Sequence, residues 1–292
     1  LHLEKQYAEK EDYLQSYAIH SAVIQLMRNS GFEFKYVFTN DDEYKAYQDL
    51  YSTTYRAYSN EIRAGGYTIY TSLDPKKQEI LQDAVDKGLK GFTEIDVATG
   101  KYTMQGAAVT IDNKTGYVVA ICGGRGTDDE FNRGFLAKRQ PGSTMKPIGV
   151  YGPAFDTGRY YPSYMMEDKA VENGPHNYYA GYRGLTSCRE ALARSINTIP
   201  FQIIMDIKPM TTLGYLGKMK FDSLCPTDNV GAISLGGLTY GARVDQMAKA
   251  YYTVFNEGVY TDNMCTRRIE FSNKGVIYSG AIEREQVYSK DT

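Results

Sequence analysis

Apolar residues recur at helical spacing over much of the first 64 residues. Between Tyr13 and Met27 they follow one helix face, and the pattern stops near Gly31. A second run then repeats in steps of three and four: Tyr44, Tyr47, Tyr51, Tyr55, Tyr58 and Ile62. Such a stripe packs against a neighbouring helix far more often than it forms an aromatic binding face, so we expect a packed amphipathic helix. Gly65-Gly66 marks a candidate boundary after these helices.

Strand patterns follow this boundary. Residues 67–72 form a β-rich run, and Asp74-Pro75 after it combines a capping residue with proline at the first helical position. We expect the helix that starts there to continue to about Lys90. Two apolar runs, 105–112 and 117–122, flank Asn113-Lys114-Thr115-Gly116 and predict a hairpin.

The rest of the chain is mostly helical and closes with a second hairpin. Helical patterns dominate residues 143–219, and another helix is expected over about 243–256. One face of that helix carries Val244, Met247, Ala248, Tyr251 and Phe255. Residues 266–271 and 276–278 around Asn273-Lys274-Gly275 predict the late hairpin. Strands at both ends with helices between them predict an α+β fold.

Composition and charge exclude several classes of protein. The chain has 292 residues, and 33 Lys and Arg against 35 Asp and Glu give a formal net charge of −2. Such a balance gives no electrostatic basis for binding nucleic acid or anionic lipid. No run approaches the ~18 apolar residues of a membrane span, so none is predicted. The chain begins at Leu1 without a signal-like segment, so we expect this start to be a cut.

The cysteines lie at positions 122, 188, 225 and 265. Their spacing contains no Cys-x-x-Cys, and no histidine lies at ligand spacing, so we expect neither a structural zinc site nor any other metal or cofactor. We interpret Cys122, Cys188, Cys225 and Cys265 as buried or half-buried thiols. Their redox state stays open.

A serine and a lysine lie three residues apart in Arg139-Gln-Pro-Gly-Ser-Thr-Met-Lys-Pro147. Proline is tolerated only in the first turn of a helix, so Pro147 predicts a helix that starts near Ser143. Ser143 would then lie at the positive end of the helix dipole, with Lys146 one turn away on the same face. A serine hydroxyl becomes nucleophilic when a base takes its proton, and a lysine of lowered pKa can be that base. Alone, Ser-x-x-Lys occurs by chance in most proteins of this size.

A second polar pair ends a short helix. Ser187 and Glu190 have the spacing of a capping box, so a helix is expected to begin near Cys188. It should end near Ser195, because Pro200 begins the next helix. Ser195-Ile-Asn197 therefore places a hydroxyl and an amide on a turn from which they can reach a cleft; local backbone capping is the simpler alternative.

These motifs resemble the transpeptidase domain of class A, high-molecular-weight penicillin-binding proteins, which share Ser-x-x-Lys and a later Ser-x-Asn. The resemblance runs in consistent order from about residue 66 to 292, and its segments are 66–75, 106–116, Phe131-Asn132-Arg133, 139–147, 189–198 and 233–237. It implies a penicillin-binding, β-lactamase-like serine transpeptidase fold, in which helices flank an antiparallel sheet. We expect residues 1–64 to be a helical interdomain linker region and residues 65–292 the transpeptidase domain.

The resemblance also implies the chemistry. Ser143 would attack the carbonyl of the penultimate D-Ala of a peptidoglycan stem peptide, and Lys146 would take its proton. Ser195 would relay a proton to the leaving amine, and Asn197 would hold Lys146 and the substrate. The acyl group would pass to an amine on a neighbouring strand, and β-lactams would acylate Ser143. The Ser143 backbone N–H and a second N–H would form the oxyanion hole.

One element of the family pattern is missing. The family's third motif, Lys-[Ser/Thr]-Gly, follows Ser-x-Asn, but here Lys114-Thr115-Gly116 precedes Ser143 and is expected to be a polar turn. Downstream only Asn273-Lys274-Gly275 is similar, without the hydroxyl. We therefore expect the fold to be incomplete on its C-terminal side, with the remainder of the polypeptide supplying the third motif. The family further implies a glycosyltransferase domain and a membrane anchor outside this chain, at the extracytoplasmic face of a bacterial membrane.

Two alternatives stay open. A D,D-carboxypeptidase or β-lactamase would use the same nucleophile but needs a carboxylate for deacylation, for which Glu167 and Asp168 are candidates by position. A non-catalytic β-lactam sensor or scaffold would be acylated without turnover, and it normally has a partner signalling domain, and none is visible in these residues.

Overall fold

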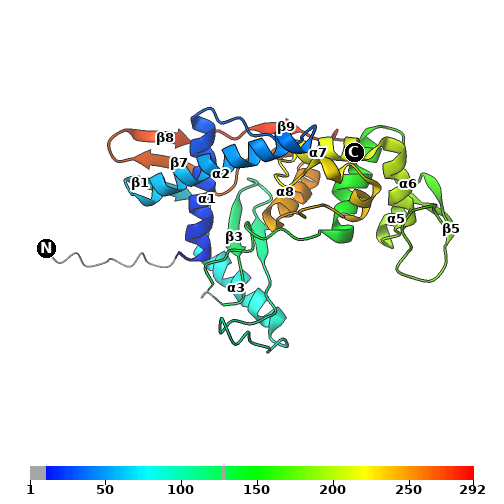
Figure 1. The fold of residues 1–292 in the computed structure, drawn as a ribbon, viewed down its shortest axis with the longest axis horizontal. Helices are drawn as coiled ribbons and strands as arrows, with labels where there is room; N and C mark the ends of the chain where they lie inside the picture. The colour runs from blue at the N-terminus through cyan, green and yellow to red at the C-terminus, as the bar shows by residue number, and fades with distance from the viewer. Residues whose placement is uncertain (1–10, 127–128) are drawn as a thin grey trace.

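The structure is a computed structural model and describes residues 11–126 and 129–292 (Figure 1). Its α-helices are α1 (Tyr13–Asn29), α2 (Asp41–Arg63), α3 (Pro75–Leu89), α4 (Gly152–Asp156), α5 (Cys188–Ala193), α6 (Thr198–Ile207), α7 (Pro209–Lys218) and α8 (Val244–Phe255). The strands are β1 (Tyr67–Thr71), β2 (Ala108–Ile111), β3 (Val118–Cys122), β4 (Met165–Asp168), β5 (Gly184–Ser187), β6 (Val259–Thr261), β7 (Thr266–Phe271), β8 (Gly275–Ser279) and β9 (Arg284–Gln286). Short helical turns of other types occupy Gly142–Thr144, Lys146–Tyr151, Pro226–Asp228 and Gly231–Leu235.

All strand pairs are antiparallel, which confirms the predicted α+β class. The order β1-β7-β8 makes a three-stranded sheet, and β2-β3, β4-β5 and β6-β9 are two-stranded. The predicted strand at 67–72 and both predicted hairpins are confirmed. The Lys114-Thr115-Gly116 segment is the turn between β2 and β3, as expected, and the Asp112 carboxylate accepts hydrogen bonds from the backbone amides of Lys114 and Thr115.

The N-terminal helices pack on the three-stranded sheet. Figure 1 shows α2 crossing α1 beside β1, β7 and β8. Val23 and Met27 of α1 share a buried cluster with Ile269 of β7, and tyrosines of α2 pack against the same cluster. The packed amphipathic helix is therefore confirmed. Because strands from residues 266–279 join helices from the first 64 residues in one core, no packing boundary separates the chain at residue 64, and the division at that residue stays a prediction.

Helix α3 lies against the β2-β3 hairpin. As predicted, Asp74 caps it by accepting from the Lys76 amide at 2.9 Å, with Pro75 in the first turn. The Gln78 side chain joins the helix to β3, because it donates to the Ile121 carbonyl and accepts from the Ile121 amide. The hairpin is thereby fixed, while the outer edge of β2 has no strand partner among the described residues.

The largest hydrophobic core surrounds the segment that follows Ser143. Met145, Ile148, Ile199, Ile203 and Phe221 are among its fully buried members. Helices α6, α7 and α8 contribute to this core, and the β4-β5 hairpin lies beside α5 and α6. The four cysteines are all buried free thiols, as interpreted from the sequence.

The predicted helix over 243–256 forms as α8, but the C-terminal half of its apolar face points outward, while Met247 packs against the largest core. Tyr251 is 42% exposed, Val254 50% and Phe255 65%, whereas polar Gln246 and Lys249 are buried on the opposite face. A surface helix normally buries its apolar stripe, so this face lacks a covering element within the described part of the chain. None of the helices described is long and apolar enough to cross a bilayer.

Candidate active site

Ser143 lies on an exposed, tightly wound turn. Residues Gly142–Thr144 form a single 3₁₀ turn, and a wider π-helical segment, Lys146–Tyr151, follows. The sequence predicted a regular helix from about Ser143, and the structure corrects this. Because Pro147 has no N–H, it cannot donate to the Ser143 carbonyl, and the regular hydrogen-bond pattern is interrupted there. The winding change leaves Ser143 exposed while Lys146, three residues later, is 0% exposed.

The turn that carries Ser143 is braced by residues 236–242. Gly236 has a φ of +75°, and a Cβ at this position would lie 2.4 Å from the Gly142 carbonyl oxygen. Two residues on, the Leu238 amide donates to the Gln140 side chain at 2.8 Å, and Ala242 pairs with Arg139 through two backbone hydrogen bonds. Only glycine allows so close an approach of two backbones. The Ser-Leu-Gly-Gly segment of the family pattern thus fixes the position of the serine turn.

The Lys146 amine lies among oxygen atoms of the second motif. Its Nζ is 3.1 Å from Ser195 Oγ, 2.7 Å from Asn197 Oδ1, 2.9 Å from the Ser195 carbonyl and 3.0 Å from the Ile196 carbonyl. No carboxylate of the described residues forms an ion pair with it. Burial lowers the pKa of Lys146 to about 8, because an ammonium loses hydration without gaining a counter-charge. A substantial neutral fraction is therefore present near neutral pH.

Ser195 is presented by the end of α5. The amides of Ser195 and Ile196 donate to the carbonyls of Leu192 and Ala191, at 3.0 and 2.9 Å. This is a Schellman ending, in which the residue after the cap takes the left-handed conformation that normally requires glycine. Ser195 has a φ of +52°. A serine held in this strained conformation directs its hydroxyl at Lys146, and strain of this kind concentrates at functional sites.

Besides the hydrogen bond that its Oδ1 accepts from Lys146, Asn197 makes two others. Its Nδ2 donates to the His176 carbonyl at 2.9 Å, and its backbone amide donates to Asn177 Oδ1 at 2.9 Å. Since the amide nitrogen is committed to a carbonyl, the oxygen is the end that faces Lys146. Asn197 is the N-cap residue directly before α6, so its side chain projects from the start of that helix.

The structure brings three of the four predicted residues into direct contact: Lys146, Ser195 and Asn197. Ser143 lies on the adjoining exposed turn, and its hydroxyl makes no hydrogen bond within the described part of the chain. The capping box expected at α5 is only half present, since Ser187 accepts from the Glu190 amide but the Glu190 side chain pairs with Arg194. Sequence reasoning missed the carbonyls of Ser195 and Ile196, because backbone acceptors leave no signal in residue identity.

Neither candidate for a deacylating carboxylate is suitably placed. Asp168 is 1% exposed and accepts from Thr198 Oγ1, Asn177 Nδ2, Tyr179 OH and the Arg183 amide. Burial opposes its ionisation, but these donors outweigh burial and lower the pKa of Asp168. Glu167 points to the exposed face of β4 and pairs with Lys169. The carboxylate of Asp168 is fully engaged by protein donors, and that of Glu167 is turned to solvent.

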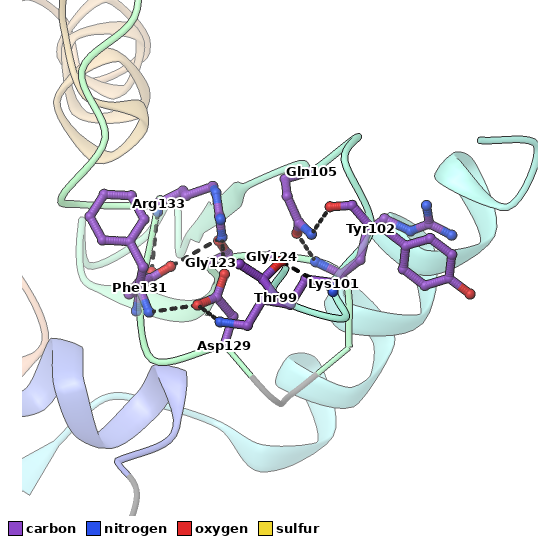
Figure 2. A network of polar contacts seen from close by, with 12 residues as sticks. Thr99, Lys101, Tyr102, Gln105, Gly123, Gly124, Asp129, Phe131 and Arg133 are labelled. Carbon is purple, nitrogen blue, oxygen red and sulfur yellow. Dashed lines mark hydrogen bonds and ion pairs between the residues drawn. The ribbon is translucent and has the colours of Figure 1, made fainter. Parts of the chain in front are cut away.

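The Phe131-Asn132-Arg133 segment has a structural role. Figure 2 shows Asp129 between Lys101 and Arg133, each of which donates to it at 2.7 Å. Burial of Asp129 opposes its ionisation, but the two cations hold its pKa at about 2. Arg133 also donates to the Gly123 carbonyl. The network therefore joins the loop after β3 to the loop before β2.

The chain matches the family model "Penicillin binding protein transpeptidase domain" over residues 106–291. This range is well over half of the chain, which therefore belongs to the penicillin-binding protein transpeptidase domain family. The resemblance stated from the motifs is thus confirmed, together with the transpeptidase fold that it implied.

Similar proteins agree with this assignment. Penicillin-binding protein 1F of Bacillus subtilis (strain 168) is 32% identical over 252 residues, which cover 85% of this chain and 33% of that protein. Penicillin-binding protein 1A/1B of the same strain is 30% identical over 281 residues, covering 86% of this chain and 30% of that protein. The chain thus spans about a third of the length of these curated relatives.

Solved structures show the same fold. The penicillin-binding protein PonA1 from Mycobacterium tuberculosis has a TM-score of 0.64 at 24% identity, over 79% of this chain and 62% of that chain. A structure of PonA1 in complex with penicillin V matches over the same shares, with a TM-score of 0.64 at 23% identity.

Proposed function

We propose that the chain is the transpeptidase part of a class A penicillin-binding protein, a serine-type D-Ala-D-Ala transpeptidase that cross-links peptidoglycan and is acylated by β-lactams. The observation that carries the proposal is the buried Lys146 amine, held by Ser195 and Asn197 and separated by one turn from the exposed Ser143. Burial without a counter-charge is what a lysine needs in order to act as a base.

The reaction assigns one role to each residue. Ser143 Oγ attacks the carbonyl carbon of the penultimate D-Ala, its proton passes to Lys146, and the C–N bond to the terminal D-Ala breaks. Among the four oxygens around Lys146, only the Ser195 hydroxyl can also donate a proton. Ser195 is therefore suited to relay the proton to the leaving amine. An acceptor amine then attacks the ester and frees Ser143, while Asn197 keeps Lys146 in place.

The alternatives with the same nucleophile are less well supported. A β-lactamase needs a carboxylate that activates water for deacylation, and neither Glu167 nor Asp168 is available for this role. A sensor or scaffold would use the same acylation step, so the Lys146–Ser195 pair does not separate it from a transpeptidase. The match to the transpeptidase domain family and to penicillin-binding protein relatives favours the transpeptidase. We therefore favour transfer of the acyl group.

We further propose that the remainder of the polypeptide completes the site. A groove of about 460 Å³ lies between the segment that precedes β2 and the start of α8, and Gly106, Ala107 and Val244 are among its lining residues. The outer edge of β2 and the exposed C-terminal half of α8 are also left uncovered by the described residues. An added strand would satisfy the backbone groups of β2 and cover Val254 and Phe255. It would carry Lys-[Ser/Thr]-Gly and the second oxyanion donor. Adding the downstream segment should raise the β-lactam acylation rate, and no gain would contradict this completion.

Within this proposal, residues 1–64 are the interdomain linker region and residues 65–292 the transpeptidase domain. A glycosyltransferase domain and a membrane anchor would lie elsewhere in the polypeptide, so that the enzyme works at the extracytoplasmic face of the bacterial membrane. Stem peptides with a D-Ala-D-Ala donor and an amine acceptor are its proposed partners.

Labelling with a fluorescent penicillin tests the function. We expect a covalent adduct on the peptide that contains Ser143, stable for hours, and no adduct in the Ser143→Ala variant. Thr144→Ala is the matched control, because it removes a neighbouring hydroxyl of the same turn and should still be labelled. Label on Ser143→Ala would refute the nucleophile, and label lost within seconds would favour a β-lactamase.

A further inference from the structure

A loop outside the family motifs makes hydrogen bonds to Asn197. Residues 176–183 follow β4 and precede β5, and their polar groups converge on two points. At one point Asp168, 1% exposed, accepts from Asn177 Nδ2 at 2.9 Å and from the Arg183 amide at 2.8 Å. At the other point this loop contacts Asn197 directly. The loop is thereby fastened to the buried end of β4.

The contacts to Asn197 decide which end of its amide faces the lysine. Asn177 Oδ1 accepts from the Asn197 backbone amide, and the His176 carbonyl accepts from Asn197 Nδ2. With its nitrogen committed to a carbonyl, Asn197 can offer only Oδ1 to Lys146, at 2.7 Å. Without the loop, the amide can rotate and present N–H groups to the ammonium.

We propose that Asp168 and Asn177 are positioning residues of the acyl-transfer site, which hold residues 176–183 so that Asn197 keeps its oxygen on the Lys146 amine. This inference rests on the proposed function. Asp168 contacts neither Lys146 nor Ser143 and acts through Asn177 and Thr198; Asn177 acts through Asn197. The carboxylate is needed because four donors converge on it, more than a neutral amide can satisfy.

Loss of the hydrogen bond from Lys146 to Asn197 should change the pKa of Lys146 in a direction that follows from the groups around the amine. The groups that face the Lys146 amine are neutral oxygens from Ser195, Ile196 and Asn197, and no ionised side chain of the described residues pairs with it. A hydrogen bond donated by the ammonium favours the charged form of a lysine and therefore raises the pKa of the lysine. Losing the Asn197 oxygen should therefore lower the pKa of Lys146 further, while the amine also loses its fixed position.

The test compares Asn177→Ala and Asp168→Asn with Glu167→Gln, a matched control on the exposed face of the same strand. The acylation rate with fluorescent penicillin is measured from pH 5.5 to 9.5, together with thermal melting. We expect Asn177→Ala to react about tenfold more slowly, with the acid limb of its profile about one pH unit lower, as the loss of one charge-assisted hydrogen bond predicts. Asp168→Asn should change the profile in the same direction, and Glu167→Gln should match the unmodified protein.

An unchanged midpoint would overturn the inference, even if the variants melt at lower temperature, because a purely structural role lowers stability without moving the profile. If Asp168→Asn does not fold, Thr198→Val removes one donor to the same carboxylate at nearly constant volume and replaces it in the comparison. If the unmodified protein is not acylated, the proposed function fails, and NMR titration of ¹³C-labelled lysine, assigned with Lys146→Arg, still tests the inference. A Lys146 pKa that is unchanged in Asn177→Ala would refute it.

Discussion

Replacing Gly236 by alanine is expected to slow the acylation of Ser143, although Gly236 contributes no side chain to the site. The new Cβ would lie 2.4 Å from the Gly142 carbonyl oxygen and 2.5 Å from the Gly142 nitrogen. Both are backbone atoms of the serine turn and cannot rotate aside as the end of a side chain can. The turn must therefore shift, and Ser143 shifts with it.

Two terms set the size of the effect. The φ of +75° costs an alanine about 1 kcal/mol, and forced overpacking costs about 1–3 kcal/mol more. We expect a loss of about 2–4 kcal/mol in the free energy of unfolding. A displacement of a reacting group by about 1 Å lowers a rate by about 100-fold, so acylation should fall by roughly that factor.

The control is Gly158→Ala, which separates backbone strain from collision. Gly158 has a φ of +72°, nearly that of Gly236, but nothing lies within 4 Å of the Cβ it would gain. This variant should lose about 1 kcal/mol of stability and keep its acylation rate. Urea unfolding and stopped-flow acylation measure the two quantities. Equal acylation rates in Gly236→Ala and Gly158→Ala would show that contact between residues 236 and 142 does not position the nucleophile.

The remaining predictions concern the amine, the strained serine and a distant cap. With a Lys146 pKa of about 8, about a quarter of the lysine is neutral at pH 7.5, against about one in a thousand at the ordinary pKa. Acylation should therefore rise with pH through about 8, and a rate that is flat from pH 6 to 9 would exclude the neutral amine as the base. Ser195→Gly relieves the φ of +52° and should be about 1 kcal/mol more stable than Ser195→Ala. Both variants should acylate slowly, and equal melting temperatures would argue against backbone strain. Asp74→Ala removes the cap of α3 and should cost about 1 kcal/mol in chemical unfolding while the labelling rate stays unchanged.

Local chemistry explains which elements the sequence could predict. The helix at Asp74-Pro75, the turn at Lys114-Thr115-Gly116 and the end of α5 near Ser195 each depend on residues within one or two turns of the chain. Capping, proline geometry and turn preferences act over that range, so sequence patterns found them. The pairing of Lys146 with Ser195 and Asn197 was available only through the family resemblance, because about fifty residues separate them.

The site depends on relationships that no local pattern encodes. The exposed apolar face of α8 has the periodicity of a buried one, since a sequence does not say which face a neighbour covers. The winding change after Ser143 and the burial of Lys146 arise from packing of the surrounding core, which sets the pKa of the amine. Likewise, Asp168 reaches Thr198, and Asn177 reaches Asn197, only because β4 and α6 lie side by side.

The amino-acid sequence thus determined the class of fold, the position of helix α3, of helix α8 and of the two hairpins at 108–122 and 266–279, and the residues proposed to carry the chemistry. It did not predict the β4-β5 hairpin, which lies within the region predicted to be helical. Tertiary structure alone decided how those residues meet. It brings Gly236 against Gly142, surrounds the Lys146 amine with neutral oxygens, and places residues 176–183 where they orient the side-chain amide of Asn197. The physical reason is that helix and turn formation are governed by neighbours along the chain. Burial, solvation and the direction of a hydrogen bond are governed by neighbours in space.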